Sequence, residues 1–552
     1  MTRLLMTVFL VLVTMIGLTL AGVHQEYGKI LVNPDMVLAD FKAQSLKNPD
    51  SLRIFTPYFG AAVAFPMLLI AMAFRFRPKG EYGNSHWATD GEIKKMGLTA
   101  QKGVILAKKS GSLLRYDKTT STLIIAPPGA GKTAGEIIPN ALYWPESLVA
   151  VDIKGEILQK TGHVRSRFSR VLDFRPAEQS EVKFNPFASE ILPKDDSGRI
   201  RHVQQISSLI YSAKGKGDSG DHWVQEARNM FNFIALYLVY TQGETSLPEI
   251  RSFALSHPNF YEWIGELVNP APEDEEVEED EELDENLPDA FEGMPSIVKE
   301  EATALSQKAY KEFSGILSSF KVKLDVFSDP TVAENFSSNS FTFEEFRTGA
   351  KPLSLYIKVS EEDMERIAPA LRILLDLLYK RLMSNEPKKE EHGVLGIFDE
   401  FPRMGFLPVV LKMPALGRSY KLPALFAFQD AAQVEEVYGK EGMRILNSST
   451  EYKLIFFQND YETAKRISDS IANYTRIKKG DSESTRDGEL KTSKSKSKNL
   501  EGAALVRADE IMSLKEDEVI VMVARWANTP IKASPAYWFR DRKMKKLVEA
   551  KG

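Results

Sequence analysis

The sequence predicts an α/β fold in which a mostly parallel sheet carries helices on both faces. Seven short apolar runs are typical of strands that are buried on both sides, as parallel strands are. Helical stretches separate most of these runs, and this alternation favours a parallel sheet. The runs are LIIA at 123–126, SLVAVDI at 147–153, VLDF at 171–174, LSLYIKV at 353–359, VLGIF at 394–398, LPALFAF at 422–428 and YKLIFFQ at 452–458.

Composition narrows the class of protein. The 552 residues are enough for several domains, and 43% hydrophobic with 27% charged residues is an ordinary globular mixture. The net charge of −5 gives no global sign of nucleic-acid binding, although an acidic segment can mask a basic surface elsewhere. The chain contains no cysteine, which excludes disulfides, thiolate metal sites and cysteine catalysis.

The sequence APPGAGKT at 126–133 follows the first strand and begins a helix. It matches the phosphate-binding pattern G-x-x-x-x-G-K-[ST], except that Ala126 replaces the first glycine. Backbone N–H groups of such a loop and the positive end of the helix dipole bind phosphates. We expect Lys132 to bind the β- and γ-phosphates of ATP, and Thr133 to bind Mg²⁺. The predicted nucleotide-binding residues are Pro128, Gly129, Ala130, Gly131, Lys132 and Thr133.

Acidic and polar side chains follow three other predicted strands. Asp399 and Glu400 come directly after the run at 394–398, as in a Walker B element. We expect Asp399 to hold Mg²⁺ and Glu400 to orient and polarise the attacking water. Gln429 directly follows the run at 422–428, and a polar side chain at such a strand end can sense the γ-phosphate. Asp152 fits equally well as a ligand at a strand end or as a helix cap.

Two uncharged apolar stretches, at 4–23 and 55–74, predict a hairpin of transmembrane helices within residues 1–80. A cleaved signal peptide is the alternative for the first stretch, but the second favours a retained anchor. Basic residues flank both outer ends of the hairpin, which favours a cytoplasmic location for them, but the bias is modest because the connecting segment 24–54 also holds basic residues. Because ATP is cytoplasmic, the nucleotide-binding part must lie there too, and we expect a membrane-anchored protein with most of its chain in the cytoplasm.

A helical domain is predicted at 191–339, inserted into a nucleotide-binding domain formed by 81–190 and 340–552. Its segments at 222–240, 261–268 and 296–326 have helical character, and we expect Trp223 and Trp263 to lie in its core. The acidic segment 273–286 is predicted to be a solvated loop, with docking of a basic partner as the alternative. The segment 476–498, which ends in KTSKSKSK, is predicted to be a flexible loop whose lysines could also contact DNA phosphates.

An ordered set of motifs resembles the TraG/TraD-type coupling proteins of type IV secretion and conjugation systems. The motifs are GNSHWAT at 83–89, APPGAGKT at 126–133, VDIKGE at 151–156, FNPF at 184–187, FDEFPRMG at 398–405, GRSYKLP at 417–423 and FAFQD at 426–430. The resemblance spans nearly the whole chain, together with the paired N-terminal stretches and the C-terminal segment.

The resemblance implies a membrane-anchored ATPase with a RecA-like motor fold that assembles as a homo-hexameric ring. Such proteins bring relaxase-bound DNA or effector proteins to the type IV secretion channel. By motif position, Arg418 corresponds to an arginine finger that acts on the nucleotide of a neighbouring subunit, and Gln429 to the sensor. No base-reading motif is present, so any DNA binding is expected to be independent of sequence.

Two other functions are compatible with parts of the sequence. An FtsK-like chromosomal DNA translocase shares the motor motifs, but that class usually has more membrane spans and a long linker. A substrate receptor that binds ATP without motor activity is the second alternative, and the pair Asp399–Glu400 together with Arg418 disfavours it.

Overall fold

The computed structural model describes residues 82–211, 222–270, 290–484 and 493–550. The predicted spans at 4–23 and 55–74 and the acidic segment 273–286 lie outside these residues. Contacts divide the chain into two compact units, Met1–Asn84 with Thr475–Gly502, and Ser85–Tyr474 with Ala503–Gly552. Within the described ranges, no helix combines the length and the apolar character that crossing a membrane requires.

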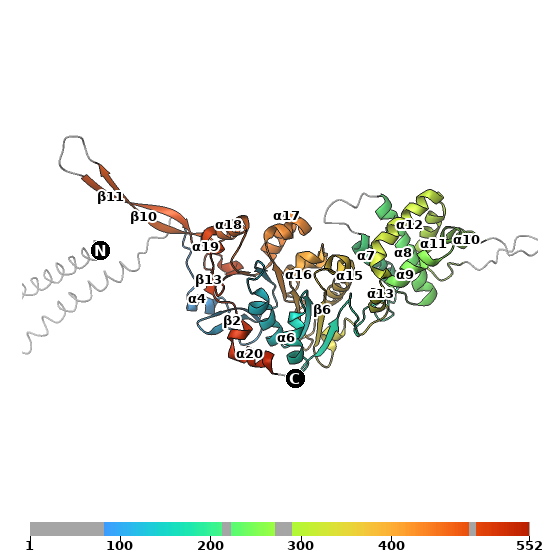
Figure 1. Ribbon diagram of the computed structural model, residues 1–552, viewed down its shortest axis with the longest axis horizontal. Helices are drawn as coiled ribbons and strands as arrows, with labels where there is room; N and C mark the ends of the chain where they lie inside the picture. The colour runs from blue at the N-terminus through green and yellow to red at the C-terminus, as the bar shows by residue number, and fades with distance from the viewer. Residues whose placement is uncertain (1–81, 212–221, 271–289, 485–492, 551–552) are drawn as a thin grey trace, which may run out of the picture. The chain divides into compact units, whose positions relative to one another are not determined.

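A nine-stranded sheet forms the centre of the second unit (Figure 1). Its strand order is β13-β12-β9-β3-β8-β7-β4-β6-β5. The strands from β9 to β5 are parallel, and β12 runs antiparallel to both β9 and β13. The strands are β3 (Thr122–Ile125), β4 (Ser147–Asp152), β5 (Arg170–Phe174), β6 (Leu353–Lys358), β7 (Val394–Phe398), β8 (Ala424–Phe428), β9 (Tyr452–Ile455), β12 (Val519–Val523) and β13 (Ile531–Ala533).

Burial explains why these sequences form strands. Every residue of β3, β4, β7, β8 and β12 is buried, so their apolar runs are covered on both faces of the sheet. All seven apolar runs of the sequence become parallel strands, which confirms the predicted α/β fold with a mostly parallel sheet.

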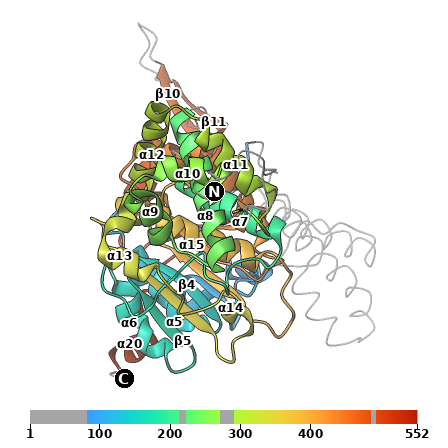
Figure 2. The same cartoon turned by 90° about the vertical axis from the view of Figure 1, so that its right-hand side faces the viewer.

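Helices cover both faces of this sheet. Alternate side chains of β3 enter different hydrophobic clusters, Leu123 and Ile125 on one face and Ile124 on the other. The first face packs against α15 (Met364–Leu382), α16 (Pro408–Leu416), α17 (Ala431–Ser449), α18 (Tyr461–Ser470) and α19 (Ala508–Met512). The second face packs against α4 (Asp90–Lys95), the helix formed by η1 (Thr133–Ile137) and α5 (Ile138–Tyr143), α6 (Glu156–Arg165), and the hairpin of β1 (Val104–Lys109) and β2 (Ser112–Tyr116). Outside α6 lies α20 (Arg542–Glu549) (Figure 2).

Arg165, at the end of α6, connects several elements on the second face. Its side chain is fully buried and donates hydrogen bonds to the backbone oxygens of Ala141, Trp144 and Glu146 and to Ser354 Oγ. These acceptors lie at the end of α5, in the loop before β4, and on β6. The guanidinium therefore satisfies carbonyl groups that the end of α5 leaves without helical partners.

Helices occupy the chain between β5 and β6. They are α7 (Asp196–Tyr211), α8 (His222–Gln242), α9 (Leu247–Ser256), α10 (Phe260–Val268), α11 (Ser296–Ser306), α12 (Tyr310–Leu324), η3 (Asp325–Ser328), α13 (Pro330–Asn335) and α14 (Glu345–Thr348) (Figures 1 and 2). Trp263 packs against the core and stacks on Phe260 with ring centroids 5.6 Å apart. The prediction that Trp223 lies in the core is wrong, because this side chain, near the start of α8, is 43% exposed.

The segment 476–498 differs from its prediction as a flexible loop. Most of it belongs to β10 (Asn473–Ser484) and β11 (Ser493–Ala504), which form a two-stranded sheet. The sequence TSKSKSK repeats with the period of two that a strand has, but both of its alternating residue types are polar. A strand without an apolar face gives no hydrophobic alternation, which is why the pattern indicated a loop.

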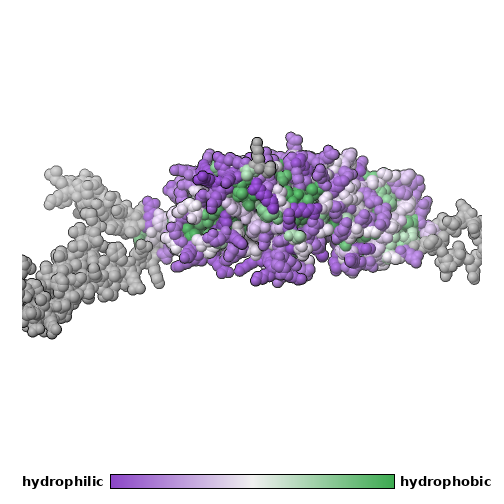
Figure 3. Space-filling view, turned by 90° about the horizontal axis from the view of Figure 1, so that it is seen from below, coloured by the Kyte–Doolittle hydropathy of each residue, from purple (hydrophilic) through white to green (hydrophobic). Residues whose placement is uncertain are grey.

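On the face that Figure 3 shows, the surface of the described chain is mainly hydrophilic. Figure 3 shows hydrophobic residues as small patches between hydrophilic ones. Large hydrophobic side chains that are at least one-third exposed include Tyr310, Tyr461 and Phe539. Single exposed hydrophobic residues are common on globular proteins, so exposure alone does not mark a site.

Candidate nucleotide-binding site

The sheet order brings the predicted site residues to one edge. β8 lies between β3, which leads into the phosphate-binding loop, and β7, which leads into Asp399 and Glu400. All three strands are parallel, so their carboxyl ends open at the same edge of the sheet. Gln429, at the end of β8, therefore lies between the loop and the acidic pair.

The loop at 126–132 has the backbone geometry that its glycines allow. Gly129 and Gly131 have φ values of 78° and 83°, in the left-handed region where a side chain is strained. Ala126 is buried, and it is not among the residues with positive φ. An alanine can therefore replace the first glycine of the pattern without backbone strain.

A compact charged cluster lies beside this loop. Lys132 Nζ is 3.0 Å from Glu400 Oε1 and 3.3 Å from Asp399 Oδ1. Thr133 Oγ1 donates a hydrogen bond of 3.3 Å to Asp399 Oδ2. Lys132 is only 7% exposed, so its ammonium group depends on these two carboxylates for charge compensation.

Glu400 is held by three side chains. In addition to Lys132, Gln429 Nε2 donates to its Oε1 at 3.1 Å, and Arg403 Nε lies 2.9 Å from its Oε2. Burial raises the pKa of Glu400, but Lys132, Gln429 and Arg403 outweigh burial and bring the pKa below its ordinary value. Its backbone has φ 57° and ψ 48°, a left-handed conformation that non-glycine residues adopt mainly where the surrounding structure imposes it. Glu400 is thus an ionised carboxylate in a fixed position.

The carboxylate of Asp399 can serve as a cation ligand. Burial raises its pKa, and Lys132 offsets part of that increase. Its Oδ1 atom is buried and forms the ion pair with Lys132 Nζ at 3.3 Å, without a hydrogen bond from the described residues. Within those residues, no group of three or more His, Cys, Asp or Glu side chains is placed to hold a metal ion. Magnesium fits this arrangement, because it binds through one or two protein oxygens and completes its shell with phosphates and water.

Asp152, which ends β4, caps a helix and lies near the acidic pair. Its Oδ2 accepts a hydrogen bond of 3.0 Å from the backbone N–H of Leu158 in α6. Burial and the nearby Asp399 charge raise the pKa of Asp152 to about 6, against the effect of its backbone hydrogen bonds. The helix-cap interpretation of Asp152 is therefore correct in the structure, since its carboxylate accepts from the first turn of α6. The negative charge of Asp399 still raises the pKa of this carboxyl group.

Arg418 is not part of this cluster. It is exposed, and its backbone oxygen accepts a hydrogen bond of 2.8 Å from Thr119 Oγ1. Thr119 precedes β3 and Arg418 precedes β8, so both lie at the amino ends of these paired parallel strands. The phosphate-binding loop lies at their carboxyl ends. Lys132, Thr133, Asp399, Glu400 and Gln429 come together in one chain, whereas Arg418 lies at the opposite edge of the sheet.

Two polar residues of the site were missed from the sequence. Arg403 contacts both Glu400 and Glu361, the latter with a distance of 2.7 Å from Arg403 NH1 to Oε1. Gln433 Nε2 donates to Gln429 Oε1 at 3.3 Å. Their spacings from Glu400 and Gln429, three and four residues, are those of neighbours on one turn or helix face and could have indicated both contacts.

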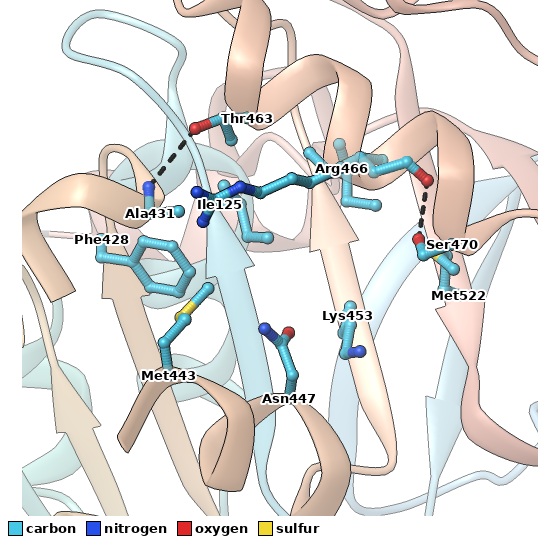
Figure 4. Close-up of a pocket in the computed structure, with 12 residues that line it drawn as sticks. Ile125, Phe428, Ala431, Met443, Asn447, Lys453, Thr463, Arg466, Ser470 and Met522 are labelled. Atoms are coloured by element: carbon cyan, nitrogen blue, oxygen red, sulfur yellow. Dashed lines mark hydrogen bonds between the residues drawn. The ribbon is translucent and has the colours of Figure 1, made fainter. Parts of the chain in front are cut away.

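Two cavities lie near the site without including the charged cluster. One, of about 820 Å³, is lined by residues that include Arg372, Arg403 and Glu361. The other, of about 270 Å³, lies where β3, β8 and β9 face α17 and α18, and is shown in Figure 4. Lys453 and Asn447 line this second cavity, and burial lowers the pKa of Lys453.

The sheet order and the cluster of Lys132, Asp399, Glu400 and Gln429 define a P-loop α/β protein of the RecA-like type. A family model described as "Type IV secretory system Conjugative DNA transfer" matches residues 86–551, and the chain belongs to this family. The predicted resemblance to TraG/TraD-type coupling proteins is thereby confirmed, and the FtsK-like and receptor alternatives are not favoured.

Individual relatives agree with this assignment. VirD4 of Rhizobium radiobacter is 25% identical over 515 residues, which are 90% of this chain and 69% of VirD4. Conjugal transfer protein TraG of Escherichia coli is 25% identical over 436 residues, which are 72% of this chain and 65% of TraG. The plasmid coupling protein TrwB, solved with ADP and Mg²⁺, has the same fold, with a TM-score of 0.57 and 17% identity over 83% of this chain and 97% of TrwB. TrwB has also been solved with non-hydrolysable ATP and GTP analogues.

Proposed function

We propose that this coupling protein hydrolyses ATP to drive substrate into a type IV secretion channel. The substrate is relaxase-bound DNA, effector protein, or both. The stretches at 4–23 and 55–74 anchor the chain in the bacterial inner membrane, with the nucleotide site in the cytoplasm. The observation that carries the proposal is the convergence of Lys132, Thr133, Asp399 and Glu400 beside one phosphate-binding loop.

The residues have separate tasks in this proposal. Lys132 exchanges its carboxylate partners for the β- and γ-phosphates, and Thr133 and Asp399 are the residues that would hold Mg²⁺. When bound, Mg²⁺ neutralises negative charge on the phosphates. Glu400, freed from Lys132, orients the attacking water and accepts its proton. Gln429 keeps its hydrogen bond to Glu400, and from its place at the end of β8, between β3 and β7, it can transmit the presence of the γ-phosphate.

Arg418 completes the site of a neighbouring subunit in a homo-hexameric ring. Its position at the amino ends of β3 and β8 supports this role, because it is exposed and on the far edge from its own phosphate-binding loop. A guanidinium supplied by a neighbour neutralises charge that develops on the transferred phosphoryl group. Hydrolysis is then possible only where two subunits meet.

DNA binding in this proposal is independent of sequence and depends on salt. Lysines of the segment 491–498 and the basic sequence RDRKMKK at 540–546 are the candidates for phosphate contacts.

The direct test is the ATPase rate of the full chain in detergent, with and without single-stranded DNA, for wild type and Glu400→Gln. We expect DNA-stimulated turnover that falls about a hundredfold or more in the variant, while ADP binding persists. Glu390→Gln, an exposed carboxylate outside the site, is the matched control. Equal turnover in wild type and Glu400→Gln contradicts the assigned role. Binding of ATP without turnover in any condition supports the receptor alternative.

A further inference from the structure

The chain that follows β13 returns to the phosphate-binding loop. β13 is antiparallel to β12, which is antiparallel to β9, so β13 runs in the direction of β9 and β3. Its end at Ala533 therefore opens at the edge of the sheet where the loop lies. The segment that continues from there has the sequence SPAYWFR at 534–540, with three consecutive aromatic residues followed by an arginine.

This segment is in direct contact with the loop and with the first turn of the helix that follows. The Tyr537 hydroxyl lies 3.5 Å from the backbone oxygen of Ala130 and donates a hydrogen bond of 2.6 Å to the backbone oxygen of Glu516. A Cβ atom on Gly131 would come within 2.7 Å of that hydroxyl, and one on Gly135 within 2.7 Å of Pro535 Cβ. Both glycines thus leave space that the returning segment fills.

Tyr537, Phe539 and Arg540 form a stack beside the loop, here called the aromatic platform. The rings of Tyr537 and Phe539 are stacked at 25° with centroids 5.2 Å apart. The Arg540 guanidinium carbon is 4.9 Å from the centroid of Tyr537 and 6.0 Å from that of Phe539. Tyr537 is buried against the loop, whereas Phe539 is 44% exposed and Arg540 is also exposed. The stack is anchored on the loop side and open to solvent on the other.

The neighbouring aromatic residue has a different environment. The Trp538 ring packs with the hydrophobic cluster around α5 and α20, and Lys160 of α6 lies 5.4 Å from its centroid. Trp538 therefore makes a structural contact, whereas Tyr537 and Phe539 form the stack that is open to solvent on one side. Only the exposed stack presents planar surface beside the residues that bind phosphate.

We propose that the aromatic platform binds the base of the nucleotide whose phosphates lie on residues 128–133. This inference rests on the proposed nucleotide site and adds the surface that recognises the nucleoside. Aromatic rings and guanidinium planes both stack on bases, and they do so through the π-face that every base has. The platform therefore selects for the size of the stacked ring system, so adenine and guanine nucleotides bind with similar affinity and pyrimidine nucleotides more weakly.

The experiment compares two polyphosphate ligands, of which only one carries a base. Calorimetry on the full chain in detergent measures the affinities for ADP and for inorganic tripolyphosphate, each with Mg²⁺. In Phe539→Ala we expect ADP affinity to fall about tenfold, while tripolyphosphate affinity stays within about twofold. Phe539→Trp, which keeps a stacking surface, should retain ADP affinity. Tyr310→Ala removes another exposed aromatic residue, 70% exposed and located in the helical insertion, and should change neither affinity.

Other outcomes separate this inference from the proposed function. Lys132→Ala should weaken both ligands, and unchanged binding of both in that variant would contradict the nucleotide site itself. If Lys132→Ala weakens binding but Phe539→Ala and Arg540→Ala bind ADP as the wild type does, the aromatic platform does not bind the base. Equal losses of ADP and tripolyphosphate affinity in Phe539→Ala would also overturn the inference, because they would show a structural effect on the loop.

Discussion

At the scale of single residues, the site consists of ion pairs whose partners differ between the nucleotide-free and the proposed nucleotide-bound state. Lys132 contacts both Asp399 and Glu400, so the phosphate-binding residue and the acidic pair neutralise each other. In the proposed function, a bound triphosphate becomes the new partner of Lys132, and Asp399 would hold Mg²⁺. Glu400 keeps Gln429 and Arg403, which explains how this carboxylate can stay in position while its ammonium partner leaves.

Gly131 provides a test of the contact between the loop and the returning segment. Gly131→Ala should destabilise the protein more than Gly111→Ala, by about 1–3 kcal/mol, and should weaken ADP binding. Both glycines have a φ of 83°, but a Cβ on Gly131 meets Tyr537 whereas a Cβ on Gly111 meets nothing within 4 Å. Denaturant unfolding and ADP titration of the two variants measure the difference. Equal destabilisation would show that Tyr537 does not restrict the loop.

The raised pKa of Asp152 predicts that the stability of the nucleotide-free protein depends on pH. Its folded-state pKa of about 6 is above the ordinary value of about 3.9, so its contribution to stability is present below about pH 4 and is lost as the pH rises through about 6. Asp152→Asn keeps an acceptor for the Leu158 N–H and does not titrate. The variant should therefore gain stability relative to wild type between pH 4 and 8, by at most about 3 kcal/mol.

Unfolding midpoints of wild type and Asp152→Asn across this pH range measure the effect, with Asp90→Asn as an exposed control. Parallel curves for wild type and Asp152→Asn would mean that Asp152 titrates normally in the folded protein.

The residues of the site differ in how far the sequence reveals them. Lys132, Thr133, Asp399, Glu400 and Gln429 were predictable, because each follows a buried strand and parallel strands end at one edge of the sheet. Tyr537 was not, because it reaches the loop through a contact between residues 407 positions apart. Such a contact has no local spacing or periodicity that a sequence could show.

At the scale of elements, buried polar connections hold the sheet and its helices together. The seven parallel strands were predicted because burial on both faces demands apolar runs. The β10–β11 sheet was not predicted, because its polar sequence lacks the alternation of apolar and polar residues that indicates a strand with one buried face. Arg165 shows a third case, in which a charged residue inside a helix satisfies backbone groups of two other elements.

Arg165→Lys should destabilise the protein by about 3 kcal/mol or more. A lysine has one ammonium group and cannot reach the four acceptors that the planar guanidinium serves, so buried carbonyl groups lose their partners. Arg167→Lys, at an exposed position in the following turn, should have an effect within about 0.5 kcal/mol. Denaturant unfolding of both variants tests this, and similar small effects in both would contradict the role assigned to Arg165.

At the scale of the whole molecule, one chain contains both parts of the proposed active site but keeps them apart. The phosphate-binding loop lies at the carboxyl ends of β3 and β8, and Arg418 lies at their amino ends. In the proposed ring, these two edges face each other in neighbouring subunits. The separation within one chain is thus the structural reason to expect an enzyme that works only as an assembly.

The measurement that tests this account most directly is the ATPase rate of mixed assemblies of Lys132→Ala and Arg418→Ala. Each variant alone should be inactive, since one lacks the phosphate-binding lysine and the other the arginine of the neighbour. In a mixture, an Arg418→Ala subunit keeps an intact loop and receives Arg418 from a Lys132→Ala neighbour, so activity should return. If co-assembly of the two variants is demonstrated and no activity returns at any ratio, Arg418 does not act on the neighbouring nucleotide and the proposed shared active site is wrong.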